Sequence, residues 1–177
     1  MNLLKLCGLE ESTECQIEFD YYVPFSVQIG NNQNSLAGEK TVYWRTGDIE
    51  RSLVEFGIGS RTGILRNLTL TAVTNSSLSD VIIKSNKSVD GIPVFDLSII
   101  PEKGIYDYIN DFQVCLGKEA ITTIIGEVEK CKTLVRFGRI NIGFDSENFI
   151  THVTVNDLTT DEYRELKDSL KLYPTSN

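Results

Sequence analysis

The chain has 177 residues, of which 41% are hydrophobic and 24% are charged, and it carries a net charge of −8. That length corresponds to about one domain, and the composition is that of a folded protein rather than a disordered one. The excess of acidic residues argues against a nucleic-acid-binding protein, which needs a basic face to offset phosphate charge. The single histidine excludes any site that requires two imidazoles.

The sequence predicts no targeting segment and no membrane span. The apolar stretch at residues 3–9 is interrupted by Lys5, whereas a secretory signal needs about 7–15 unbroken apolar residues. No run approaches the roughly 18 apolar residues of a membrane span. We therefore expect a cytoplasmic protein with reduced thiols. No two cysteines form a CxxC pair, so we expect no metal and no cofactor. The cysteines are Cys7, Cys15, Cys115 and Cys131.

Strand patterns dominate the chain from its beginning to about residue 155. Aromatic and β-branched residues fill most of these segments, and turn-forming residues separate them. Pro24 interrupts the first segment and predicts a bend or an edge position there. Loops are expected at residues 31–38 and 75–80. The predicted strands are residues 16–29, 40–45, 52–58, 64–73, 81–84, 94–100, 112–116, 121–125, 133–144 and 149–155.

One clear helix is predicted, over residues 160–172. Thr159 and Glu162 form a T-x-x-E capping box at its start, and an apolar stripe follows at helical spacing. The stripe consists of Tyr163, Leu166, Leu170 and Tyr173. We therefore predict an α+β fold that is mainly β, with antiparallel hairpins in one or two packed sheets and a C-terminal helix.

Two segments of the chain resemble each other. Residues 56–70 and 142–155 both contain a strand, a turn with Gly or Asn, and a second strand with apolar residues two apart. A shift of 86 residues places Phe56 on Ile142, and with one residue of slack Leu68 falls on Val153. We expect a single domain over residues 1–177, with pseudo-duplicated halves of about 1–88 and 89–177 as an alternative organisation.

His152 is the only candidate for general acid–base chemistry. It alternates with Val153 and Val155, so we expect it on the outward face of a strand, exposed to solvent. The alternative is a hydrolase in which His152 is paired with Asp145 or Asp157. No G-x-S-x-G motif is present to support a serine hydrolase.

Acidic residues are concentrated in the second half of the chain. Residues 1–88 carry 8 basic and 10 acidic groups, whereas residues 89–177 carry 9 and 15. The helix and its lead-in hold the densest group, which is Asp157, Asp161, Glu162, Glu165 and Asp168. One interpretation is a solvated helix face, with acids placed favourably near the helix N-terminus. The alternative is a surface that attracts a basic protein, because opposite charges on two proteins speed their association.

Two segments resemble small cytoplasmic immunity proteins of bacterial polymorphic toxin systems. The first contains VYWR at residues 42–45, ERSLVEFGI from Glu50, and a Thr-Gly turn before an apolar strand. The second is the tail FDSENFITHVTVNDLTTDEYRELKDSL. The resemblance implies a non-enzymatic protein that binds and neutralises one toxin, and it carries no contact residue over.

We therefore expect an acidic binding protein that occludes a basic toxin, with no bound nucleic acid and no catalytic residue. The partner-binding residues would be the five acids above and aromatic anchors, since tyrosine and tryptophan are favoured in such contacts. The candidate anchors are Tyr21, Tyr22, Tyr43 and Trp44. The alternatives are a small-ligand binder that uses the interior of a β-barrel or sandwich, and the hydrolase built on His152.

Overall fold

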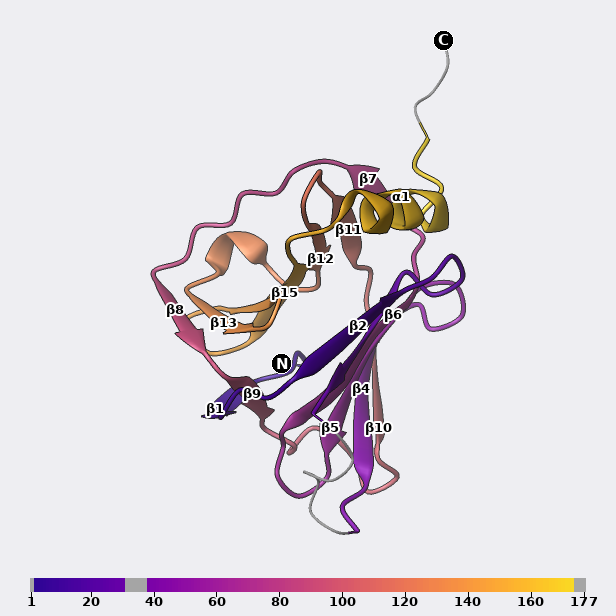
Figure 1. The fold of residues 1–177 in the computed structure, drawn as a ribbon. Coiled ribbons are helices and arrows are strands. Elements are labelled where there is room, and N and C mark those ends of the chain that lie inside the picture. Colours follow the sequence, from indigo (N-terminus) through magenta and orange to yellow (C-terminus); the bar gives the residue numbers. More distant parts are fainter. Residues whose placement is uncertain (1, 31–37, 174–177) are drawn as a thin grey trace.

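The computed structural model describes residues 2–30 and 38–173 and contains two large β-sheets and one α-helix (Figure 1). In spatial order, the first sheet consists of β10 (Ile105–Ile109), β4 (Thr41–Gly47), β5 (Leu53–Gly59), β6 (Leu65–Ala72), β3 (Phe25–Ile29) and β2 (Cys15–Phe19). The second consists of β7 (Ser76–Leu78), β11 (Gln113–Leu116), β12 (Ile121–Ile124), β15 (Ile150–Val155), β14 (Ile140–Phe144), β13 (Thr133–Phe137) and β8 (Lys87–Asp90). The remaining elements are the pair β1 (Leu6–Glu10) and β9 (Ile92–Phe95), the short 3₁₀-helix η1 (Val128–Lys130) and α1 (Thr160–Ser169). The fold is α+β and mainly β, as predicted.

Most of the predicted strands are confirmed. The strands predicted at 40–45, 52–58, 64–73, 112–116, 121–125 and 149–155 are β4, β5, β6, β11, β12 and β15, within two residues at each end. Two longer segments are each a hairpin rather than one strand. The segment 16–29 turns around Pro24 between β2 and β3, and the segment 133–144 turns at Gly138 between β13 and β14.

Other predictions of strands and loops were wrong. Residues 81–84 form no strand, and the strand predicted at 94–100 is β9, which ends at Phe95. The loop predicted at 75–80 contains β7, whereas most of the loop predicted at 31–38 lies outside the described residues. Strands β1, β8 and β10 were not predicted.

The two sheets share one hydrophobic core, which aromatic side chains cross from one sheet to the other. Trp44 and Phe56 of the first sheet meet edge to face with ring centroids 5.6 Å apart. Phe95 of β9 follows at 6.3 Å from Phe56, and Phe144 of the second sheet follows at 6.1 Å from Phe95. All four side chains are buried, so this series of rings links the two sheets through the core.

Both sheets are built on the same path of the chain. Strands β2 to β6 and strands β11 to β15 each form five antiparallel strands in the spatial order third, fourth, fifth, second, first. The predicted repeat falls on equivalent hairpins, β5–β6 and β14–β15. Each sheet then gains a parallel strand beside its third strand, which is β10 next to β4 and β8 next to β13.

The boundary near residue 88 does not divide the two sheets. Strand β7 lies before that boundary and pairs in the second sheet, whereas β10 lies after it and pairs in the first. The halves therefore exchange strands, and a cut at residue 88 would separate pairs in both sheets. That the halves arose by duplication stays a prediction.

Helix α1 begins at the predicted capping box. Thr159 Oγ1 accepts a hydrogen bond from the backbone N–H of Glu162, and the Glu162 carboxylate accepts one from the N–H of Thr159. Leu166 is fully buried, and α1 lies against β11 and β2. The helix ends at Ser169, three residues before the predicted end.

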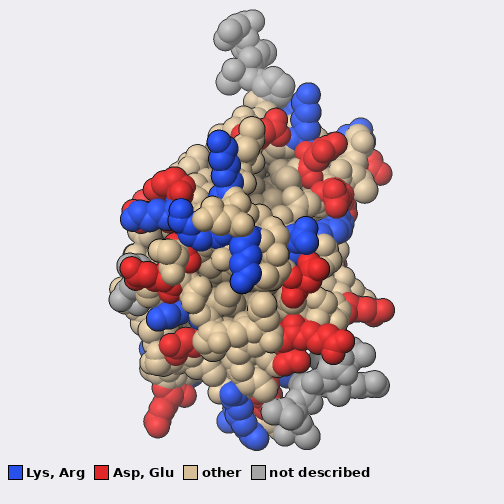
Figure 2. All heavy atoms as spheres, turned by 90° about the vertical axis from the view of Figure 1, so that its left-hand side faces the viewer, with Lys and Arg blue, Asp and Glu red and all other residues tan. Residues whose placement is uncertain are grey.

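Positive and negative side chains are mixed on one face of the molecule. On the face seen from the left of Figure 1, blue and red groups alternate with tan areas (Figure 2). The net charge of −8 therefore does not gather into one acidic field on that face. In residues 2–30 and 38–173, no helix has the length and apolar character needed to cross a membrane.

Candidate functional site

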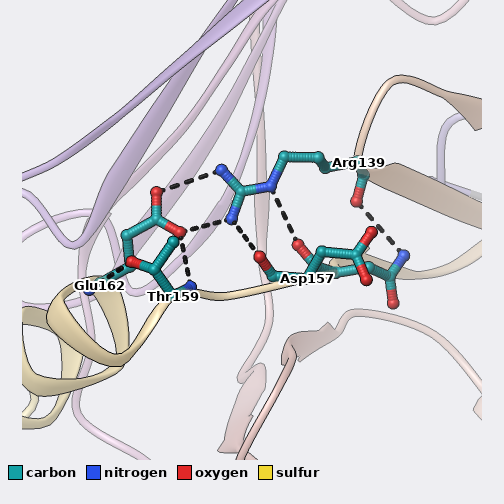
Figure 3. A network of polar contacts seen from close by, with 5 residues as sticks. Arg139, Asp157, Thr159 and Glu162 are labelled. Atoms are coloured by element: carbon teal, nitrogen blue, oxygen red, sulfur yellow. Dashed lines mark hydrogen bonds and ion pairs between the residues drawn. The ribbon is translucent and has the colours of Figure 1, made fainter.

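The acidic residues around α1 fall into two kinds: Glu162 is paired within the fold, and the others lie at the surface. Glu162 is held inside the fold by Arg139, which lies in the turn between β13 and β14 (Figure 3). The Arg139 guanidinium donates to both carboxylate oxygens of Glu162, at 3.1 and 2.5 Å, and to the carbonyls of Asn156 and Asp157. This pairing lowers the pKa of Glu162 below its usual value. Glu162 thus joins α1 to the second sheet and is not free to bind a partner.

The other predicted acids remain at the surface. Asp157, Asp161 and Glu165 are exposed, and Asp168 is half-buried. Two cations, Arg164 and Lys167, lie among them on the same helix, and Arg164 reaches Asp161 at 3.6 Å. The helix is therefore only moderately acidic.

The two aromatic residues predicted from strand β4 do not lie near α1. Trp44 is 0% exposed, and its indole Nε1 donates to the carbonyl of Asn2, so the prediction that it anchors a partner was wrong. Tyr43 is half-buried on the same strand. Three strands separate β4 from β2, which contacts α1, so about 19 Å of sheet lies between them.

Three other tyrosines do gather beside α1. The Ser169 hydroxyl donates to the carbonyl of Tyr21 at 2.7 Å and so fixes the end of the helix against the turn between β2 and β3. Tyr21 and Tyr22 stack edge to face at 5.1 Å, and Tyr22 is 83% exposed. Tyr173 is 58% exposed, which corrects its placement in the buried stripe. Desolvation, then Asp168 and Tyr21, raise the pKa of Tyr173, which places it in the same group.

We call this group the tyrosine–acid surface, and it consists of Tyr21, Tyr22, Asp161, Glu165, Asp168 and Tyr173. Most of these residues were predicted from the sequence as partner-binding candidates, but the sequence does not show that the turn after β2 contacts the end of α1. The only sequence signal was the pair of adjacent tyrosines in a predicted bend.

His152 lies in a pocket, not at the surface. As predicted, the side chains of His152 and Val153 lie on opposite faces of β15. The prediction of solvent exposure was wrong, because His152 is only 1% exposed. The register of β14 and β15 shifts here: Phe144 pairs with Ile150 and Gly143 with His152, so Thr151 is an extra residue. Such a bulge places Thr151 and His152 toward the same side of the sheet. Burial lowers the pKa of His152 to about 4.

The pairing required by the hydrolase alternative is not formed. His152 Nδ1 is 2.9 Å from the hydroxyl of Thr151, and neither Asp145 nor Asp157 forms a hydrogen bond with the ring among the described residues. Asp145 instead accepts backbone hydrogen bonds in the turn before β15. The nearby thiol of Cys131 is buried and its pKa is raised by desolvation, so it is a poor nucleophile.

The interior of the fold is filled rather than hollow. The aromatic series from Trp44 to Phe144 occupies the space between the sheets. A cavity of about 330 Å³ lies on the outer face of the second sheet and is lined in part by His152. The four cysteines form no disulfide, and in the described ranges no three His, Cys, Asp or Glu side chains gather where they could hold a metal ion.

No known family matches the sequence, and no curated protein matches it. Two features of the described residues could bind another molecule, the tyrosine–acid surface and the pocket at His152.

Proposed function

We propose that this is a non-enzymatic cytoplasmic binding protein that neutralises a cognate basic toxin by occluding it. The proposal rests on the tyrosine–acid surface. Its main support is the exposure of the adjacent Tyr21 and Tyr22, at 45% and 83%, because neighbouring exposed aromatic rings form a patch of the kind that marks interaction sites.

The chemistry of this surface suits a partner rich in lysine and arginine. A tyrosine ring attracts a cation that lies over its face, and tyrosines dominate the energy of many protein interfaces. The nearby carboxylates of Asp168 and Glu165 would favour approach of a positive surface and reject a negative one. Glu162 contributes indirectly, because its pairing with Arg139 holds α1 in place.

The first test is co-purification from the native lysate with the tagged protein, followed by mass spectrometry. A stoichiometric basic protein is expected, and its activity in a toxicity assay should fall when this chain is added. Retention of that protein should weaken in Tyr21→Ala plus Tyr22→Ala, since these substitutions remove the exposed rings and leave the core intact.

A charge-reversal pair tests the electrostatic part. Asp161→Lys plus Glu165→Lys should slow association at low salt, whereas Glu102→Lys plus Glu147→Lys, which changes the same charge at exposed positions elsewhere, should change it less. If both pairs behave alike and the tyrosine variant binds normally, the tyrosine–acid surface is not the binding site. Absence of any protein partner would contradict the proposed function itself.

A further inference from the structure

The pocket at His152 has a floor of strands and a roof formed by one connecting segment. The floor includes Thr122 of β12, Asn141 of β14, and His152 and Thr154 of β15. The roof is residues 79–86, which run from β7 toward β8 around the outside of the second sheet (Figure 1). We call this segment the strap.

The strap is attached mainly at its ends. Ser79 N–H donates to the carbonyl of Leu116, and Asn86 N–H donates to that of Lys132. Between them no backbone hydrogen bond joins the strap to the described residues of the sheet. Val81 and Ile83 face the pocket, while Ile82 between them is 88% exposed. The strap can therefore move without breaking a β-ladder.

The floor offers hydrogen-bonding groups that the fold does not use. Nδ1 of His152 is taken by Thr151, whereas Nε2 has no hydrogen-bond partner among the described residues. Thr122 and Thr154 share one hydrogen bond at 3.1 Å. Asn156 uses its side-chain nitrogen on the carbonyl of Arg139, so its side-chain oxygen remains an acceptor. Nε2 is not among the fully buried side-chain atoms of the described residues that lack a partner, so it keeps some contact with solvent and can accept a hydrogen bond from a ligand.

The charges around the pocket have one sign. Asp80 and Glu119 line it, and no Lys or Arg is among its described lining residues. Asp80 is fixed in position, since its carboxylate accepts a hydrogen bond from the backbone N–H of Lys118. His152 is neutral near pH 7, because burial lowers its pKa to about 4. An anion would meet two carboxylates and no cation among the described lining residues, so the pocket disfavours phosphate or carboxylate ligands.

We propose that this pocket binds a small organic cation, an amine or guanidine on a short aliphatic chain. Its N–H groups would donate to Glu119, to Asn156 and to the free nitrogen of His152, while its carbons would lie against Val81, Ile83 and Leu134 of the lining. The cavity volume of about 330 Å³ is at the lower end of the range for ligand pockets. This inference goes beyond the proposed function and does not depend on the tyrosine–acid surface.

The single histidine makes the test direct, because isotopically labelled His gives one imidazole signal from the whole protein. We would titrate the folded, full-length chain with agmatine and follow the NMR shift of His152. Glucose serves as a neutral polar probe and inorganic phosphate as an anionic one. A saturable shift with agmatine alone supports the proposal. No shift with agmatine, or a shift with glucose or phosphate in its place, overturns it.

Matched variants locate the charge that matters. Glu119 is exposed at the rim, so Glu119→Gln should leave the fold intact and weaken agmatine binding by about tenfold, the effect of losing one charge-assisted hydrogen bond. Glu147→Gln removes the same charge from an exposed turn outside the lining and should not weaken binding. Equal affinities in the two variants would overturn the assignment. Fluorescence of Trp44, the single tryptophan, checks that each variant is folded.

Discussion

The imidazole of His152 lies across Gly143 of the neighbouring strand. A Cβ at Gly143 would come within 2.1 Å of Cε1 of the ring and 2.7 Å of the Thr151 hydroxyl. The equivalent pair in the first sheet is Asn67 and Gly57, where a Cβ would lie 2.3 Å from the Asn67 amide oxygen. In both sheets, a polar side chain of the fifth strand thus occupies the space that a glycine of the fourth strand leaves free.

Gly143→Ala should therefore destabilise the protein. The ring of His152 is buried and cannot move aside freely, so we expect a loss of about 1–3 kcal/mol in the free energy of unfolding. Urea unfolding followed by Trp44 fluorescence measures it. The matched control is Gly8→Ala, where a Cβ meets only Val94 at 3.7 Å, and it should cost less. Equal losses in the two variants would contradict the packing described here.

The buried histidine should make stability depend on pH. Burial lowers the pKa of His152 from 6.5 to about 4, so the unfolded chain binds more protons between these two values. The free energy of unfolding is therefore unaffected by this group above pH 6.5 and falls as the pH drops toward 4, by about 3 kcal/mol in all. Titration of the single imidazole signal by NMR checks this directly. A midpoint near 6.5 in the folded protein would show that the ring is solvated.

Glu162 should make the free energy of unfolding depend on pH in a lower range than His152 does. Its pairing with Arg139 lowers its pKa from 4.5, so the unfolded state binds more protons below that value. The stabilisation is present above pH 4.5 and is lost as the pH falls through the folded-state pKa. We expect Glu162→Gln to be less stable than the natural protein at pH 6 and to lose less on acidification. The urea midpoints of this variant and of Glu147→Gln, measured side by side, provide the comparison.

The strap should open more readily than the sheet below it. Residues 80–85 donate no backbone hydrogen bond to the sheet, whereas Thr154 and His152 lie in paired strands. Hydrogen exchange followed by mass spectrometry should show fast exchange in the strap and slow exchange in β15. Protection of the strap equal to that of β15 would mean that it is held by contacts beyond those described, and it would make ligand access by strap movement untenable.

Alternation in the sequence was enough to predict the main strands, but it does not show which segments pair. Trp44, Val54 and Phe56 alternate with polar residues, and all three are buried. The run from Val81 to Lys84 is just as apolar, yet it crosses the sheet instead of joining an edge. Strand β10 was not predicted, although its residues alternate between exposed and half-buried, with Ile109 64% exposed; it follows the turn formers Pro101 and Gly104 directly.

The candidate sites depended on contacts that are distant in the sequence. Alternation with Val153 gives the face of His152 but not its burial, because the strap that covers it comes from about 70 residues earlier in the chain. In the same way, the turn that holds Tyr21 meets the end of α1 through the hydrogen bond from Ser169 to Tyr21, two segments about 148 residues apart. Short-range patterns cannot contain these relationships.

The exchange of β7 and β10 between the two halves has a consequence for how the molecule unfolds. Each sheet contains an edge strand that the other half of the chain supplies. Neither five-stranded set can therefore pair with its last edge strand until the rest of the chain has folded. Melting should occur in one cooperative step, despite the twofold repetition of the topology, and separately expressed halves should fold only when mixed.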